Sequence, residues 1–248
     1  MALSRNEIKL IRSLQEKKGR EASRLFLVEG VKMVEELFCQ SKYRIESVFY
    51  TNDYNGKIPA DVHAYAVSEA ELERISGLMS PNKILALVKY PPRFIPDWTN
   101  EQLVLVLDEV RDPGNLGTIL RTADWFGVKT VIASETSVDL YNPKVIQASM
   151  GAVFRINYVQ DNLINIMAEL QEQSFKIYGA DLKGKDLYQV DFAARSAIVM
   201  GSESHGLTQG VQQMLTEVVT IPRFGKTESL NVAMDAGIIL SHFRSKVI

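Results

Sequence analysis

The run S-A-I-V-M-G-S-E-S-H-G-L, residues 196–207, sets the pattern on which the second half of this chain is built. A similar run, T-E-V-V-T-I-P-R-F-G-K-T-E-S-L-N-V, occupies residues 216–232. In each, a β-branched stretch (197–200 and 218–221) stops at a loop of glycine and small polar residues. Continuous apolar runs are typical of strands buried in a parallel sheet. The two loops are therefore expected at the carboxyl ends of the strands, where open α/β sheets bind ligands. Ser229 is expected to cap a helix that continues to Leu240.

A third stretch, upstream of these two, shows the same pattern of an apolar run followed by a polar loop. Residues 103–107 are continuously apolar and predict another buried strand, which leads into D-E-V-R-D-P-G-N-L-G-T-I-L-R-T-A-D-W-F-G-V, residues 108–128. Residues 112–115 have the composition of a turn. A helix is expected from Leu116 to Phe126, carrying Arg121 and ending at Gly127. The loop and the helix would bring polar side chains to the same edge of the sheet.

Together the three stretches resemble the SpoU (TrmH-like) family of RNA ribose 2′-O-methyltransferases, part of the SPOUT superfamily. The family's motifs are an Asn…Arg loop and helix, a Gly-x-Glu loop and a Ser-Leu-Asn-Val helix start. Here they stand, in the same order, at residues 115–121, 201–203 and 229–232. The similarity extends from about residue 103 to the C-terminus. It implies a knotted, mainly parallel α/β domain with a trefoil knot, S-adenosylmethionine as the cofactor, and a homodimer formed through this domain.

The resemblance also implies roles for individual residues. The backbones of Gly201, Ile221 and Leu230 match positions that flank the cofactor, and the catalytic positions are Arg121, Asn115, Glu203, Ser229 and Asn231. Because a guanidinium stays protonated in proteins, we expect Arg121 to orient the ribose hydroxyl and stabilise the developing alkoxide, not to act as a base. Asn231 and Ser229 would hold the ribose or the cofactor carboxylate. Glu203 would fix Arg121 or a neighbouring backbone group.

The first 90 residues predict a smaller α/β sandwich. Strands are expected at residues 24–28, 45–50, 63–67 and 84–89, and helices at residues 7–16, 31–40 and 69–75. Ser68 and Glu71 have the spacing of a capping box. The stretch F-L-V-E-G-V-K-M-V-E-E-L, residues 26–37, resembles the start of the ribosomal-protein-like substrate-binding domain of these enzymes. The proline-rich segment 91–97 is the expected linker, and residues 98–248 form the expected methyltransferase domain.

In that second domain, strands are further expected at 130–133, 155–159 and 176–180, with helices at 142–151 and 163–173. This alternation of strands and helices favours a mainly parallel sheet.

Composition narrows the class of protein. The chain has 248 residues, of which 46% are hydrophobic and 23% charged, enough for one large or two small cores. No apolar run is long enough to span a membrane, and no secretory signal is evident. The single cysteine, Cys39, is expected to pack in the core, and with no signal sequence the cytoplasm is the expected compartment. His63, His205 and His242 are scattered, so we expect no metal, and a structural or exposed role for His205.

Charge is unevenly distributed. The formal net charge is −2, which does not suggest a strongly basic nucleic-acid binder. The first 24 residues, however, carry seven basic and three acidic side chains, and a local basic patch can attract a polyanion. Lys17, Lys18 and Arg20 are the centre of this predicted patch. A solvated amphipathic helix is the alternative interpretation.

The sequence therefore predicts an S-adenosylmethionine-dependent enzyme that methylates a ribose 2′-hydroxyl of structured RNA, with ribosomal RNA as the expected substrate. Two alternatives stay open. One is the same reaction on transfer RNA. The other is a catalytically idle RNA-binding factor for ribosome assembly, which the presence of all five polar site residues disfavours.

Overall fold

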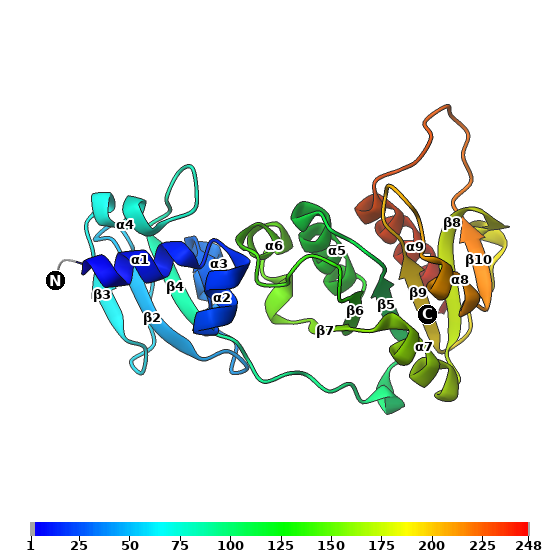
Figure 1. Cartoon of the computed structure of the whole chain (residues 1–248), viewed down its shortest axis with the longest axis horizontal. Helices are drawn as coiled ribbons and strands as arrows, with labels where there is room; N and C mark the ends of the chain where they lie inside the picture. Colours follow the sequence, from blue (N-terminus) through cyan, green and yellow to red (C-terminus); the bar gives the residue numbers. More distant parts are fainter. Residues whose placement is uncertain (1–2, 248) are drawn as a thin grey trace. The chain divides into compact units, whose positions relative to one another are not determined.

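The computed structural model describes residues 3–247 and divides the chain into two compact units. The first unit runs to Pro92 and also includes Asp139–Phe154. The second contains Arg93–Val138 and everything after Phe154. Figure 1 shows the elements of both units.

The second unit is built on six strands that pair in parallel throughout (Figure 1). The sheet order is β10-β8-β9-β5-β6-β7. The bounds are β5 Leu103–Leu107, β6 Thr130–Ser134, β7 Asn157–Asp161, β8 Lys176–Asp186, β9 Ser196–Met200 and β10 Glu217–Thr220. β5, β6 and β9 are buried along their whole length, as their apolar runs predict. The α/β class and the parallel sheet are confirmed.

Helices of this unit cover the sheet and support the loops. They are α5 Pro113–Trp125, α7 Leu163–Glu172, α8 Gln209–Gln213 and α9 Val232–Val247, with short 3₁₀ turns η1 Trp98–Asn100 and η3 Leu187–Gln189. Alternate strand positions such as Val104, Val106 and Val199 share one apolar cluster with α7 and α8. α5 and α9 pack against each other.

Two predicted helix starts in this unit are wrong. Asp112 accepts a hydrogen bond from the Asn115 N–H at 2.8 Å and is the N-cap of α5, so residues 112–115 begin the helix and are not a separate turn. Pro113 suits the first helical position because a backbone N–H there would have no partner within the helix, so its absence costs no hydrogen bond. α9 begins at Val232, not at Ser229, because Asn231 accepts from the Ala233 N–H at 2.9 Å and caps the helix instead. α8 was not expected from the sequence.

The first unit holds a four-stranded sheet in the order β1-β4-β2-β3. Its strands are β1 Leu25–Glu29, β2 Ile45–Tyr50, β3 Ala64–Ala66 and β4 Ile84–Lys89, and its helices are α1 Arg5–Ser13, α2 Lys17–Ser23, α3 Val31–Phe38, α4 Glu69–Ile75 and α6 Pro143–Ser149. η2 Ala152–Phe154 is a 3₁₀ turn. The predicted capping box of α4 is present: Ser68 and Glu71 each accept from the other's backbone N–H.

The inclusion of Asp139–Phe154 in the first unit has a visible cause. The ring of Tyr141 stacks on Phe26 with 4.4 Å between centroids. Gln147 donates to the Glu29 carbonyl at 2.8 Å, and Tyr43 donates to the Val153 carbonyl at 3.1 Å. A segment that the sequence pattern assigns to the second domain therefore packs on β1 of the first unit.

Arg20 is not the surface residue that the sequence suggested. Lys17 begins α2, so the predicted helix end at residues 17–20 is wrong, and the Arg20 side chain is 1% exposed. Its guanidinium donates to Asp139 at 2.6 and 3.0 Å and to the carbonyls of Leu14 and Gln15. These partners satisfy a buried charge that water cannot reach.

Arg20→Gln is expected to destabilise the first unit by about 3 kcal/mol, because it leaves the Asp139 carboxylate without its cation in a largely buried place. Urea unfolding followed by circular dichroism measures the change. Lys18→Gln, which removes an exposed charge two residues away, is the control and is expected to stay within about 0.5 kcal/mol of the parent. Equal stability of the two variants would contradict the structural role of Arg20.

Cys39 is exposed, against the expectation of core packing. It follows the last residue of α3, where its backbone N–H caps the helix end. The buried positions of this helix fall at Met33, Val34 and Leu37, so helical spacing turns residue 39 toward solvent. No helix in the described part of the chain is both long and apolar enough to cross a membrane.

Candidate active site

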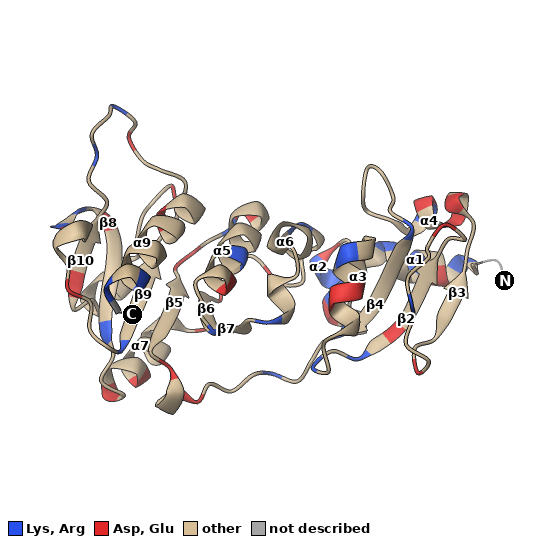
Figure 2. Cartoon of the chain, turned by 180° about the vertical axis from the view of Figure 1, so that it is seen from behind, with Lys and Arg blue, Asp and Glu red and all other residues tan. Residues whose placement is uncertain are grey.

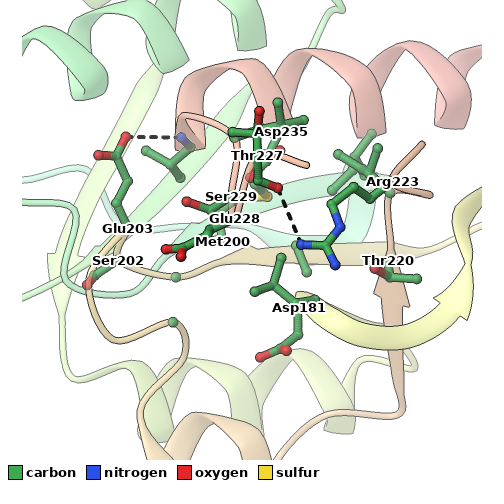
Figure 3. Close-up of a pocket in the computed structure, with 18 of the residues that line it drawn as sticks. Asp181, Met200, Ser202, Glu203, Thr220, Arg223, Thr227, Glu228, Ser229 and Asp235 are labelled. Carbon is green, nitrogen blue, oxygen red and sulfur yellow. Dashed lines mark hydrogen bonds between the residues drawn. The ribbon is translucent and has the colours of Figure 1, made fainter. Parts of the chain in front are cut away.

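The loops after β9 and β10 line a cavity of about 590 Å³ (Figure 3). Both loops leave the carboxyl ends of parallel strands, and the wall is completed by Ala180–Leu182 of β8 and by the first turns of α9. All lining residues belong to the second unit. The cavity is thus where strand order and loop composition predict a ligand, and its volume suits a molecule of cofactor size.

The predicted cofactor residues Gly201, Ile221 and Leu230 all line this cavity. Gly201 has a clear steric reason to be glycine. A Cβ built there would lie 2.4 to 2.7 Å from backbone atoms of Gly206 and Leu207. The close approach is maintained by Ser202 and Gly206, which exchange two backbone hydrogen bonds of 3.0 and 2.9 Å. The loop therefore presents its backbone directly to the cavity.

Three of the predicted catalytic residues meet in one hydrogen-bond network. Asn115 comes from α5, Glu203 from the loop after β9, and Asn231 from the cap of α9. Glu203 Oε1 accepts from Asn115 Nδ2 at 3.0 Å, from Asn231 Nδ2 at 2.7 Å and from the Val232 N–H at 3.2 Å. Asn231 Nδ2 also lies 2.9 Å from Asn115 Oδ1. The bond from Val232 is drawn in Figure 3.

A smaller cavity of about 210 Å³ adjoins the larger one at Glu203. Ser202, Glu203, Ser204 and Val232 line both cavities and so form a shared wall. The smaller cavity is also lined by Asn115 and by Arg111, whose guanidinium pairs with Glu109 at 3.1 Å. Arg111 was not predicted, although a cation four residues before Asn115 could have pointed to it.

The remaining two predicted catalytic residues are placed differently. Ser229 is exposed and lines the larger cavity, but it is not part of the Glu203 network. Arg121 is exposed on α5, six residues after Asn115, and lines neither of the two cavities. The second unit alone therefore does not bring Arg121 to the other four, and its catalytic role stays a prediction.

The side chains that line the larger cavity carry a net negative charge. Four carboxylates line it, those of Asp181, Glu203, Glu228 and Asp235, against one arginine, Arg223. Arg223 donates to the Thr227 carbonyl at 3.3 Å and stays within the loop after β10. Burial, together with the negative charge of Glu203, raises the pKa of Asp235 to about 6. Sequence reasoning missed Asp235, although it lies four residues after Asn231 and therefore on the same helical face.

These features fit S-adenosylmethionine. Its net positive charge suits the carboxylate-rich wall, and its adenosine and methionine parts can use the exposed backbone of the two glycine-containing loops. Residues 224–227, F-G-K-T, belong to the cavity loop and do not form the phosphate loop that they superficially resemble, because residue 220 is threonine and not glycine. Within residues 3–247 no group of three or more His, Cys, Asp or Glu side chains is placed to hold a metal ion.

Comparison with known proteins identifies the family of this chain. The sequence model of the SpoU rRNA Methylase family matches residues 102–241, more than half of the chain. The chain belongs to the SpoU family. The model of the MRM3-like substrate binding domain matches residues 5–86.

Relatives resemble this SpoU protein over its whole length. The 23S rRNA (guanosine(2553)-2′-O)-methyltransferase RlmP of Bacillus subtilis is 30% identical over 243 residues, which is 96% of each protein. A solved structure of a TrmH-family RNA methyltransferase from Porphyromonas gingivalis is 38% identical, with a TM-score of 0.90 over 99% of both chains. The AdoMet-bound rRNA methyltransferase of Sinorhizobium meliloti is 26% identical, with a TM-score of 0.85 over 100% of this chain and 97% of that one. SpoU methyltransferases use S-adenosylmethionine, as this bound structure illustrates.

Proposed function

We propose that this protein transfers a methyl group from S-adenosylmethionine to a ribose 2′-hydroxyl of 23S ribosomal RNA. The observation that carries the proposal is the Asn115–Glu203–Asn231 network, whose central residue, Glu203, lines both a cofactor-sized cavity and a second, smaller one. A transferase needs this arrangement, because donor and acceptor must approach from opposite sides of the reacting carbon. The full-length similarity to RlmP, named for 23S rRNA, supports the choice of RNA.

The bound cofactor would supply a methyl group on a positively charged sulfur, which accepts a nucleophile without further activation. The chain's own task is to hold the ribose hydroxyl in line with that methyl group. Backbone groups of Gly201, Ile221 and Leu230 would hold the cofactor, with Ser229 beside them. Asn115, which lines the smaller cavity, would then position the ribose, and Asn231 would hold Glu203 and Asn115 in place.

Glu203 is the centre of this geometry. The hydrogen bonds that the described chain makes to its carboxylate end on Oε1, which leaves Oε2 to accept from the ribose hydroxyl. A carboxylate fixed by three donors loses little freedom when the substrate binds. Arg111 at the smaller cavity is a cation suited to the adjacent phosphate. Arg121 would stabilise the developing alkoxide once RNA or a second copy of the chain brings it to the site.

We also propose residues 1–90 as the RNA-binding domain, 91–97 as the linker and 98–248 as the catalytic domain. The two family models fall on either side of the linker and support this division. On α1, the basic residues Arg5, Lys9 and Arg12 are exposed and recur at helical spacing. In Figure 2 the positions of Lys and Arg residues are coloured blue on the ribbons of α1 and α2. A ribosomal RNA substrate would place the protein in the cytoplasm.

The basic surface gives a prediction. Lys17 and Lys18 are exposed, so the double variant Lys17→Glu/Lys18→Glu is expected to weaken RNA binding and to reduce the slope of log K against log salt by about 1 to 2, since fewer counterions are released. Filter binding at several salt concentrations measures both. Cofactor affinity is the internal control and should not change. RNA affinity and slope equal to those of the parent would show that this face of α2 is only solvated.

A homodimer through the second unit and a trefoil knot belong to the same proposal. Trp125 on α5 is 84% exposed and Met234 on α9 is 62% exposed, although these two helices pack together. A second copy packed on α5 and α9 would remove these two side chains from water, and a symmetric pair is the commonest oligomer. Light scattering on the parent and on Trp125→Glu tests the dimer, which the glutamate should dissociate.

The function is tested by incubating the purified protein with tritiated S-adenosylmethionine and 23S rRNA from a strain that lacks the gene. We expect label in a single ribose, found by mass mapping, and none in rRNA from the parent strain, where the site is already methylated. Transfer RNA from the same strains is the matched alternative substrate. Label only in transfer RNA would replace the proposed substrate, and label in neither, with RNA binding intact, would favour an assembly factor.

A further inference from the structure

The Asp235 carboxylate lowers the stability of the folded protein when no ligand is bound. Asp235 lies on the first turn of α9, with its carboxylate half-buried in the wall of the larger cavity. Within the described residues its side chain makes no hydrogen bond or ion pair, and the charge that acts on it is the like charge of Glu203. A carboxylate without a cation in such a place is destabilising. Residues of this kind persist where a ligand supplies the missing partner.

The position of Asp235 indicates what that partner is. The methyl group to be transferred has to lie at the wall shared by the two cavities, beside Glu203 and Val232. Asp235 stands one helical turn after Asn231, on the cofactor side of this wall, and its interaction with Glu203 reflects their proximity. Figure 3 shows Glu203 and Asp235 at the α9 end of the cavity. In a sulfonium cofactor, the positive charge sits on the atom that carries the methyl group.

We propose that Asp235 is a specificity-determining residue that recognises the sulfonium charge of S-adenosylmethionine and thereby favours it over S-adenosylhomocysteine, whose sulfur is neutral. The proposal rests on the cofactor of the proposed function. The two molecules share adenosine, ammonium and carboxylate groups and differ in the methyl group and its charge. Product that has lost the charge would leave the site more readily than the cofactor that enters it.

Other charged groups near Asp235 set the design of the test. From the loops and β8, the cavity is faced by Glu203, Glu228, Asp181, Arg223 and His205. On α5, which packs against α9, the charged residues are Arg121 and Asp124, and Asp124 pairs with Arg155 at 2.7 Å. η3, which also contacts α9, contains none. His205 is the histidine among these cavity residues, so its contribution has to be separated with a variant of its own.

Calorimetric titration of Asp235→Asn with S-adenosylmethionine and with S-adenosylhomocysteine is the direct test. At pH 8 we expect the variant to bind S-adenosylmethionine about 10-fold more weakly, because a partly exposed charge pair is screened but not abolished. Binding of S-adenosylhomocysteine should change less than about 2-fold, since that sulfur carries no charge. Glu172→Gln on α7 removes an exposed carboxylate outside the cavity and is the matched control for net charge.

The pH dependence supplies a second readout. In the parent, affinity for S-adenosylmethionine should fall as the pH drops through about 6, where the pKa of Asp235 lies and the carboxylate takes up a proton. Affinity for S-adenosylhomocysteine should stay level. In Asp235→Asn the fall should vanish. A fall that survives in Asp235→Asn but disappears in His205→Gln would assign the effect to the histidine and overturn the proposal.

Folding of the variant is checked by its melting temperature. The pKa of Asp235 is raised in the folded state, so its contribution to stability is full below the ordinary aspartate pKa and is lost as the pH rises through about 6. Removing the charge should therefore raise the melting temperature of the ligand-free protein by a few degrees at pH 8. A lower melting temperature would show that the carboxylate is stabilised by contacts within the protein. It would contradict the inference that Asp235 lacks a partner until a cationic ligand binds.

The outcomes separate this inference from the proposed function. If the parent protein binds neither molecule, the cofactor assignment fails. If the parent binds both and Asp235→Asn weakens both by the same factor, or neither, the cofactor stands and the sulfonium recognition is wrong. Only a selective loss of S-adenosylmethionine supports the proposal.

Discussion

Gly201→Ala is expected to weaken the binding of S-adenosylmethionine by about 100-fold, because forcing an extra carbon into closely packed atoms costs on the order of 1 to 3 kcal/mol and about 2.8 kcal/mol corresponds to 100-fold in affinity. The added Cβ would lie 2.4 Å from the Gly206 carbonyl carbon, 2.5 Å from its oxygen and 2.7 Å from the Leu207 nitrogen. These are backbone atoms, so no side chain can rotate aside to make room. The loop has to move, and with it the two hydrogen bonds between Ser202 and Gly206 that shape the cavity wall.

Gly225→Ala is the matched control. Gly225 lines the same cavity, but a Cβ there meets no atom within 4 Å. Calorimetry on both variants therefore compares a methyl group that collides with one that does not. We expect the Gly225 variant to stay within about 3-fold of the parent. Similar affinities for the two variants would show that the backbone of the loop after β9 does not hold the cofactor.

Arg121→Ala is expected to lower the rate of methyl transfer by a factor on the order of 10² to 10³, the usual cost of removing one donor that stabilises a developing oxyanion. RNA and cofactor affinities should change far less, since a contact made mainly in the transition state affects kcat more than binding. Arg121→Lys should fail almost as badly, because an ammonium cannot reproduce the planar fork of donors. Tritiated methyl transfer to undermethylated 23S rRNA, with both affinities measured in parallel, provides the readout.

Lys129→Ala serves as the control for this experiment. It removes an exposed cation just before β6, at the amino end of the sheet and away from both cavities. The structure makes the Arg121 experiment decisive, because Arg121 lies apart from the Asn115–Glu203–Asn231 network in the single chain. Methylation by Arg121→Ala at the rate of the parent would remove this arginine from the mechanism and leave Glu203 as the principal catalytic residue.

Predictions from sequence succeeded where the signal is local. The strands 84–89 and 103–107 match β4 and β5 because each is a nearly continuous apolar run with a clear stop, and 45–50 matches β2 because β-branched and aromatic residues dominate it. The capping box at Ser68 fixes the start of α4 for the same reason. The start of α9 was misplaced because Ser229 and Asn231 are both good N-caps. Only the folded backbone selects between them, and it selects Asn231.

The site was predicted in part. Residue identities and their order along the chain were enough to recognise the motifs that hold Asn115, Glu203 and Asn231, and the loops that hold Gly201, Ile221 and Leu230. Their order did not reveal that one oxygen of Glu203 joins three donors from two helices, since residues 115 and 203 are 88 positions apart. It also did not reveal the two cavities on either side of this wall.

The sequence by itself determined the alternation of strands and helices, the family and the polar groups of the site, because hydrophobic periodicity and short motifs are written in neighbouring residues. Tertiary structure alone decided which charged side chains are buried and which groups lie beside them. Arg20 looks like one of several surface cations until Asp139, 119 residues later, is found beside it. Asp235 looks like an ordinary helix carboxylate until it is found in the wall of the cavity, where the negative charge of Glu203 acts on it. The burial of a charged side chain and the electrostatic field that acts on it depend on which distant segments of the chain meet. No local sequence pattern carries that information.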